Sequence, residues 1–191
     1  MVRTIITPTR NFYDKAVAMK DEPFMQDLGS EIVPWLLFAG EHHFEHMAFN
    51  SRSRTFPNGY HKLGTIRYKA DHVRLPASQE LFAFESSEFN AGKAPRGSLR
   101  LHHVVVCPLE ELTSEEIMMD GFDSRDDMLY QMTKMEGRYY KDLTPASLVS
   151  YFKFGALSPV SDDPVLAYVQ KKLPHWNKLK EQDKTGWTNN I

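Results

Sequence analysis

A lysine, a threonine and an arginine lie within six residues of one another in the segment Lys62-Leu-Gly-Thr-Ile-Arg67. The run from Thr65 to Lys69 is rich in β-branched and aromatic residues, and a turn signal precedes it, so the sequence predicts a strand. Side chains alternate between the faces of a strand, which places Thr65, Arg67 and Lys69 on one side. Lys62 can fold back over them, so that a hydroxyl, a guanidinium and two ammonium groups converge. Such a group suits an anion, a polarised carbonyl or a nucleobase edge, while a solvated strand face with ordinary surface charges is the alternative.

Charge is segregated along the chain although the net charge is only −2. From Arg52 to Arg74 there are six basic residues and one acid, whereas Glu110 to Asp127 holds eight acids and one base. A net charge near zero argues against strong non-specific binding to nucleic acid. The first stretch nevertheless predicts a basic patch, in which Arg52 and Arg54 of a polar, mobile loop contact the flanks of a substrate. The alternative is that the two stretches face each other or solvent.

Length and composition are those of one soluble globular domain. The chain has 191 residues, of which 41% are hydrophobic and 25% charged. Its one cysteine, Cys107, cannot form an intramolecular disulfide, follows three valines and is predicted to be a buried strand residue rather than a nucleophile. No run of about 18 apolar residues and no secretory signal is present, so we expect a cytoplasmic protein that does not enter a membrane.

Local patterns predict a mixed arrangement of strands and helices. Thr113-Ser-Glu-Glu116 is a capping box that begins a short helix, and Gly121 ends it. Asp123 or Ser124 caps a second helix, whose apolar stripe is core rather than a cofactor site: Met128, Leu129, Met132 and Met135. The segment 35–38 is buried, as strand or helix. We expect strands at 3–7, 81–84, 99–106 and 148–154, and helices at 14–25, 40–49 and 164–173.

The helix expected at 40–49 carries a possible zinc motif, His42-x-x-Glu45-His46. On a helix the two histidines share a face, with the glutamate as a general base. The motif is short and no further acidic ligand is evident downstream. We therefore expect packing or surface histidines here, with no bound metal.

Three blocks of the sequence resemble the ASCH domain, a small β-barrel related to the PUA fold. They are Lys62-x-x-Thr-Ile-Arg67, the segment 112–129 with its Leu-Thr-Ser-Glu-Glu-Ile start and Asp120-Gly-Phe centre, and Ser147-Leu-Val-Ser-Tyr-Phe-Lys-Phe154. They occur in the family's order and cover roughly residues 60 to 154. The resemblance implies an α+β protein with an N-terminal extension at 1–31, an ASCH (PUA-like) domain at 32–156 and a C-terminal helical extension at 157–191.

The resemblance also implies a chemistry. Some ASCH proteins are amidohydrolases that remove the acyl group from N4-acetylcytidine nucleosides, and their lysine, threonine and glutamate map to Lys62, Thr65 and Asp120. In that role Thr65 is the nucleophile, Lys62 takes its proton, and Asp120 protonates the leaving amine or binds the base edge. Arg67 or backbone amides would stabilise the oxyanion. No cofactor is required. For Asp120 the alternative is a helix-end carboxylate beside Gly121.

Two other function classes remain open from the sequence. PUA-related barrels commonly hold RNA or a modified base. In such a binding module Arg67, Lys69 and the Arg52/Arg54 loop would contact phosphates, and Tyr68 or Tyr60 would stack on a base. The third class is a module that binds a protein partner through the acidic helical face. A nucleoside or RNA is thus the expected ligand, and the sequence leaves the oligomeric state open.

Overall fold

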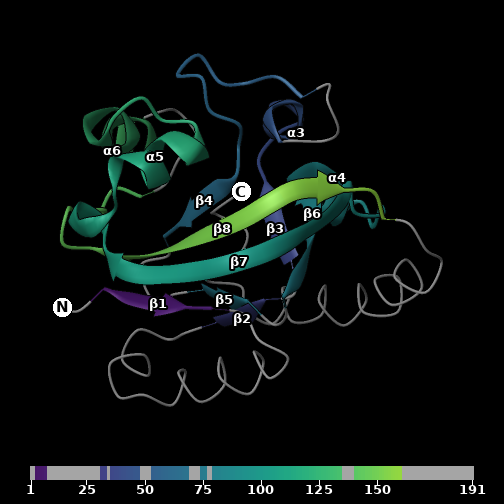
Figure 1. Cartoon of the computed structure of the whole chain (residues 1–191), viewed down its shortest axis with the longest axis horizontal. Coiled ribbons are helices and arrows are strands. Elements are labelled where there is room, and N and C mark those ends of the chain that lie inside the picture. The colour runs from purple at the N-terminus through teal and green to yellow at the C-terminus, as the bar shows by residue number, and fades with distance from the viewer. Residues whose placement is uncertain are drawn as a thin grey trace.

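The computed structural model describes residues 3–7, 31–33, 35–47, 53–68, 74–76, 79–134 and 140–160. Within them a six-stranded sheet carries α5 and α6 on one side (Figure 1). A separate two-stranded parallel sheet consists of β2 and β5. The mixed α+β class predicted from the sequence is confirmed. The strands are β1 (Thr4–Ile6), β2 (Glu31–Val33), β3 (Trp35–Phe38), β4 (Gly64–Arg67), β5 (Arg74–Pro76), β6 (Glu80–Glu85), β7 (Gly97–Pro108) and β8 (Leu148–Ser158). The helices are α3 (His42–His46), α4 (Ser86–Asn90), the 3-10 turn η2 (Leu109–Glu111), α5 (Ser114–Asp120) and α6 (Arg125–Lys134).

The main sheet is built around two long antiparallel strands, β7 and β8. Its order is β3-β6-β7-β8-β4, and β1 pairs with the far end of β7. Among the described strand pairs of this main sheet, β3 with β6 is the parallel one. The strands predicted around Thr65, Leu81, Leu99 and Leu148 therefore share one sheet, as expected, and the edge strand expected at 3–7 is β1. The buried segment 35–38, left open between strand and helix, is strand β3.

The main sheet is open, so the predicted barrel is not confirmed. In the described part of the chain no backbone pairing joins the two outer strands, β3 and β4, and a closed barrel requires an unbroken ring of strand pairs. A side chain nevertheless spans the gap. Arg67 at the end of β4 donates a hydrogen bond from Nη2 to the carbonyl oxygen of Leu37 in β3, 2.8 Å away. The sheet is thus curved enough to bring its two edges within the reach of one arginine.

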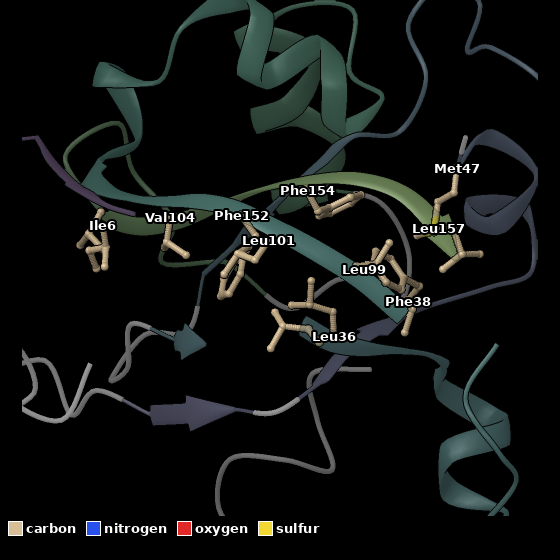
Figure 2. Close-up of a cluster of buried hydrophobic side chains, with 13 residues drawn as sticks. Ile6, Leu36, Phe38, Met47, Leu99, Leu101, Val104, Phe152, Phe154 and Leu157 are labelled. Carbon is tan, nitrogen blue, oxygen red and sulfur yellow. The ribbon is translucent and has the colours of Figure 1, made fainter. Parts of the chain in front are cut away.

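Apolar side chains cover both faces of this sheet. One cluster lies between β7–β8 and β3, as Figure 2 shows for Leu36 of β3, Leu99 of β7 and Phe152 of β8. A second cluster packs the opposite face against α5 and α6, with Ile66 and Tyr151 on the sheet side and Met128 on the helix side. From the edge strand β4, Ile66 enters this second cluster.

Helices α5 and α6 form where their local signals predicted. Thr113 accepts a hydrogen bond from the Glu116 amide at 3.2 Å, and Glu116 accepts one from the Thr113 amide at 2.7 Å. Gly121 follows α5 with a φ of 106°, a conformation that favours glycine. Ser124 caps α6 by accepting from the Asp127 amide at 3.1 Å. The predicted stripe of α6 is core at Met128 and Met132, while Met135 lies outside the described residues.

Some predicted elements fall outside the described residues. These are the helices expected at 14–25 and 164–173, together with most of the two extensions at 1–31 and 157–191. Among the helices that the structure does describe, none combines the length and the apolar character needed to span a membrane.

Replacing Gly64 by alanine should destabilise the fold. The added Cβ would lie 2.2 Å from Oη of Tyr151, a ring that is completely buried and cannot move aside. We expect the free energy of unfolding to fall by about 1–3 kcal/mol, measured by urea denaturation. Gly155→Ala is the control, because its Cβ would lie 3.0 Å from the ring of the exposed His102, which can move aside, and 3.9 Å from the Arg100 carbonyl oxygen. Equal stability of the two variants would contradict the packing described for β4.

Candidate functional site

A buried ion pair joins the start of β4 to the end of α5. The ammonium of Lys62 contacts Oδ1 of Asp120, and it also donates to the Asp120 carbonyl oxygen at 3.0 Å. Lys62 is 1% exposed, and the side chain of Asp120 is 8% exposed. The second carboxylate oxygen accepts a hydrogen bond from the Ile66 amide at 2.8 Å. One carboxylate therefore binds both the lysine and the backbone of β4, at the edge of that strand not paired to β8.

Local structure brings Asp120 to this place. It is the last residue of α5, and the left-handed Gly121 turns the chain immediately after it. Lys62 is fixed from the other side, since its own amide donates to the carbonyl oxygen of His46 at 2.8 Å. The two residues are 58 positions apart, so the pair holds the helical layer against the sheet.

Two aromatic rings flank the ammonium of Lys62. Its Nζ lies 5.7 Å from the ring centroid of Phe38 and 5.9 Å from that of Phe56. Both distances allow a cation–π attraction. Water is excluded as well, so the attraction between Lys62 and Asp120 is screened less than at the surface.

Thr65 and Arg67 form a second polar group on the same strand. The guanidinium Nη1 donates to Thr65 Oγ1 at 2.6 Å, while Thr65 itself is fully buried. Arg67 is held by further hydrogen bonds to the carbonyl oxygens of Ile66 at 3.2 Å and Leu37 at 2.8 Å. Its Cζ lies 5.2 Å from the ring centroid of Phe38. Phe38 thus packs against both the guanidinium of Arg67 and the ammonium of Lys62.

The predicted shared face of Thr65 and Arg67 is confirmed by their hydrogen bond. Of the residues expected to join them, Lys62 and Asp120 contact each other at the adjacent edge of β4. Lys62 and Thr65 are sealed from solvent rather than lining an open surface. The carboxylate of Asp120 reaches both Lys62 and the backbone of β4.

Other predicted contact residues lie elsewhere. Tyr68 packs in the opposite core, where its hydroxyl donates to Asp142 Oδ2 at 3.0 Å, and its ring meets Tyr140 edge-on at 5.2 Å. It is 8% exposed, so the prediction that it stacks on a base is wrong for this arrangement. Arg54 is at the surface, 79% exposed, and its nearest acidic partner is Glu45 at 3.9 Å. Arg52 and Lys69 lie outside the described residues.

The predicted basic patch is also corrected. Lys62 is buried against Asp120 and Arg67 is half-buried on Thr65 and Leu37, so neither adds an exposed charge beside Arg54, which is at the surface. The alternative, that the basic and acidic stretches face each other, is realised at the Lys62–Asp120 pair.

Sequence reasoning missed the loop that covers this pair. Phe56 stacks on the His46 ring with centroids 4.3 Å apart, and Asn58 donates from Nδ2 to the carbonyl oxygens of Met118 and Phe122 at 3.2 and 3.3 Å. The described part of the loop expected to be mobile is therefore docked on the end of α5. The one available signal was a lone aromatic residue, Phe56, in a polar stretch.

The histidines of α3 take part in aromatic packing. The His42 and His43 rings have centroids 4.0 Å apart, and His43 also packs against Phe38 at 5.8 Å. Across the described residues no group of three or more histidine, cysteine, aspartate or glutamate side chains is placed to hold a metal ion.

Buried groups near the sheet have shifted acidities. Burial raises the pKa of Tyr151, and the charge of Asp120 raises it further, so this hydroxyl stays protonated. Burial also raises the pKa of Cys107 to about 11, against a lowering effect of Arg3. A thiol in that state is a poor nucleophile at neutral pH. The prediction that Cys107 is a buried strand residue is confirmed.

Comparison with known proteins identified no relative. No protein-family model matches the chain, and neither the curated proteins nor the solved structures contain a significant match.

Breaking the buried pair from one side should destabilise the protein strongly. Lys62→Met and Asp120→Leu each leave a buried charge without its partner, so we expect losses of about 3–5 kcal/mol in the free energy of unfolding. The double variant should lose clearly less than the sum of the two. Chemical denaturation at pH 7 measures all three.

The exposed pair Arg54–Glu45 is the control for this cycle. Its members are 79% and 52% exposed, so its removal should change the free energy of unfolding by about 0.5 kcal/mol or less. Strictly additive losses at Lys62 and Asp120 would show that the two charges do not depend on each other.

Proposed function

We propose that this chain is an ASCH-type domain that binds an acylated nucleobase or nucleoside at Lys62, Thr65 and Asp120 and hydrolyses its acyl amide, as in N4-acetylcytidine. The observation that carries the proposal is the buried Lys62–Asp120 pair next to a buried threonine that accepts a hydrogen bond from an arginine. A buried ion pair is an expensive way to stabilise a fold, because apolar residues of similar volume often do so better. Functional sites are a common reason for such groups.

The chemistry assigned to these residues is acyl transfer to a threonine. Oγ1 of Thr65 attacks the acyl carbonyl carbon. Lys62 takes the hydroxyl proton while it passes one of its own to the Asp120 carboxylate. The pair then returns a proton to the leaving amine nitrogen as the amide bond breaks. Water hydrolyses the resulting threonine ester and restores the hydroxyl.

In the proposed acyl transfer, Arg67 stabilises the attacking oxygen of Thr65. Its hydrogen bond to Thr65 Oγ1 is charge-assisted, and such a bond favours negative charge developing on that oxygen. The carbonyl oxygens of Leu37 and Ile66 hold the guanidinium in place before substrate arrives. A donor fixed in advance costs no reorganisation during the reaction.

The shape of the sheet also supports the proposal. We propose that the curved, open sheet is a PUA-like barrel in which the side chain of Arg67, rather than strand pairing, links β4 to β3. The site then lies at the seam between the two outer strands. The alternative of a phosphate-binding groove is weaker, because Lys62 and Arg67 direct their charges inward.

The hydroxyl of Thr65 should be essential for hydrolysis. Thr65→Val keeps the volume of this buried side chain but removes the nucleophile, so kcat/KM for N4-acetylcytidine should fall by about a thousandfold or more. Thr65→Ser keeps a hydroxyl and should retain most of the activity. Chromatography of cytidine released from N4-acetylcytidine gives the rates, and a fully active valine variant would exclude the nucleophile role.

Arg67→Lys should separate hydrolysis from RNA binding. A lysine keeps the charge but cannot donate to Thr65 and Leu37 together, so kcat should fall by about 10²–10³ while KM changes little. In an RNA-binding module the same change would leave affinity nearly intact. Salt-dependent RNA binding, without hydrolysis of any acylated cytidine by the wild type, would favour the binding module over the enzyme.

A further inference from the structure

We propose that residues 53–60 form a lid over the Lys62–Asp120 pair, sealed by Phe56 and held shut by Asn58. The inference rests on the proposed function for its purpose, because a substrate must reach side chains that are closed off in this structure. Lys62 and Thr65 are 1% and 0% exposed. Both can meet a ligand only after some covering element has moved.

Phe56 is the part of the lid that lies on the site. Its ring centroid is 5.9 Å from the ammonium of Lys62, and the ring stacks on His46. It also lies directly over Gly121, where a Cβ would come within 2.7 Å of the phenylalanine ring. A side chain at position 121 would therefore collide with Phe56 of the lid. The φ of 106° at Gly121 favours glycine as well.

Asn58 is the part of the lid that fixes it to the rest of the protein. Its amide nitrogen donates to the carbonyl oxygens of Met118 and Phe122, at the end of α5. Its side-chain oxygen accepts from the Tyr60 amide at 3.0 Å, which shapes the turn. The turn is closed further by backbone bonds from Phe56 to Tyr60 at 2.7 Å and from Gly59 to Phe56 at 2.9 Å.

These contacts describe a compact turn. The turn is also attached to α3, where the Arg54 amide donates to the carbonyl oxygen of Glu45 at 2.9 Å. The turn has its own internal hydrogen bonds and can therefore move as a unit. What ties it to α5 is the pair of bonds from Asn58 and the packing of Phe56. Such a balance of internal and external contacts is what a loop needs to open without unfolding the sheet. Closure would exclude water from the proposed acyl transfer.

The test measures how fast Lys62 reacts with a small acylating reagent. Brief pulses of N-hydroxysuccinimidyl acetate, followed by peptide mass spectrometry, give the labelling rate of Lys62 relative to Lys93, which is 64% exposed in the same molecule. Asn58→Asp removes both donated bonds but keeps the oxygen that Tyr60 uses. It also sets a negative charge against the carbonyl end of α5. The relative rate should rise on the order of tenfold or more, as expected for two lost hydrogen bonds.

Phe56→Ala should raise the relative labelling rate as well, by removing the cover over the ammonium. The control is Thr55→Ala, an exposed position in the same turn, which should label like the wild type. Unchanged labelling of Lys62 in both Asn58→Asp and Phe56→Ala would overturn the lid. A faster labelling of Lys62 that is accompanied by an equal increase in amide hydrogen exchange in β7 would also overturn the lid. Global unfolding would then be what exposes Lys62.

The same experiment separates the lid from the proposed chemistry. Faster labelling of Lys62 in Asn58→Asp with no hydrolysis of acylated cytidine by any form supports the lid and removes the amidohydrolase. Hydrolysis by the wild type, with labelling of Lys62 indifferent to both lid substitutions, supports the enzyme and removes the lid.

Discussion

The ion pair between Lys62 and Asp120 is the constraint on which the arrangement of this domain depends. Two charges removed from water must stay within contact distance, because either one alone would be strongly unfavourable in a buried site. The pair therefore fixes the end of α5 against the start of β4. The amide of Ile66 adds a backbone bond to the same carboxylate, which fixes the register of the helix end along the strand.

This ion pair explains how β4, an edge strand of only four residues, can position Thr65 and Arg67. β4 pairs with β8 on one side, and its other edge meets Asp120 and, through Arg67, the carbonyl of Leu37. Side chains and a helix end take up groups that another strand would otherwise pair. Barrel closure by hydrogen-bonded strands would fill the place where these polar side chains meet. An open seam bridged by an arginine leaves that place to Thr65 and its neighbours.

The sequence predicted what local rules control. Alternation placed Thr65 and Arg67 on one face, and the capping box and Gly121 gave both ends of α5. The same alternation places Tyr68 on the face opposite to Thr65 and Arg67. Its assignment as a ligand-stacking residue therefore conflicted with the alternation used for those two residues. That error came from treating an aromatic residue beside basic residues as a stacking platform, whereas its ring completes the core beneath α6.

What the sequence could not give was contact across long separations. Only the segregation of charge and the resemblance hinted that Lys62 would meet Asp120, and neither fixed a distance. The barrel was expected from the resemblance, but closure depends on how far the sheet curls, which no local pattern encodes.

The described loop shows how this limit bears on function. Residues 53–60 look like a flexible connection because they are rich in polar and turn-forming residues. Two hydrogen bonds from Asn58 and one aromatic ring dock this turn on α5. The attachment is slight beside the buried pair beneath it, which binds α5 to β4 with two charges and a backbone bond. The lid should therefore detach from α5 more readily than Lys62 separates from Asp120. Lys62 and Asp120 can then stay in contact while the lid opens. If the lid were attached as strongly as the ion pair, opening it would cost as much free energy as separating α5 from the sheet.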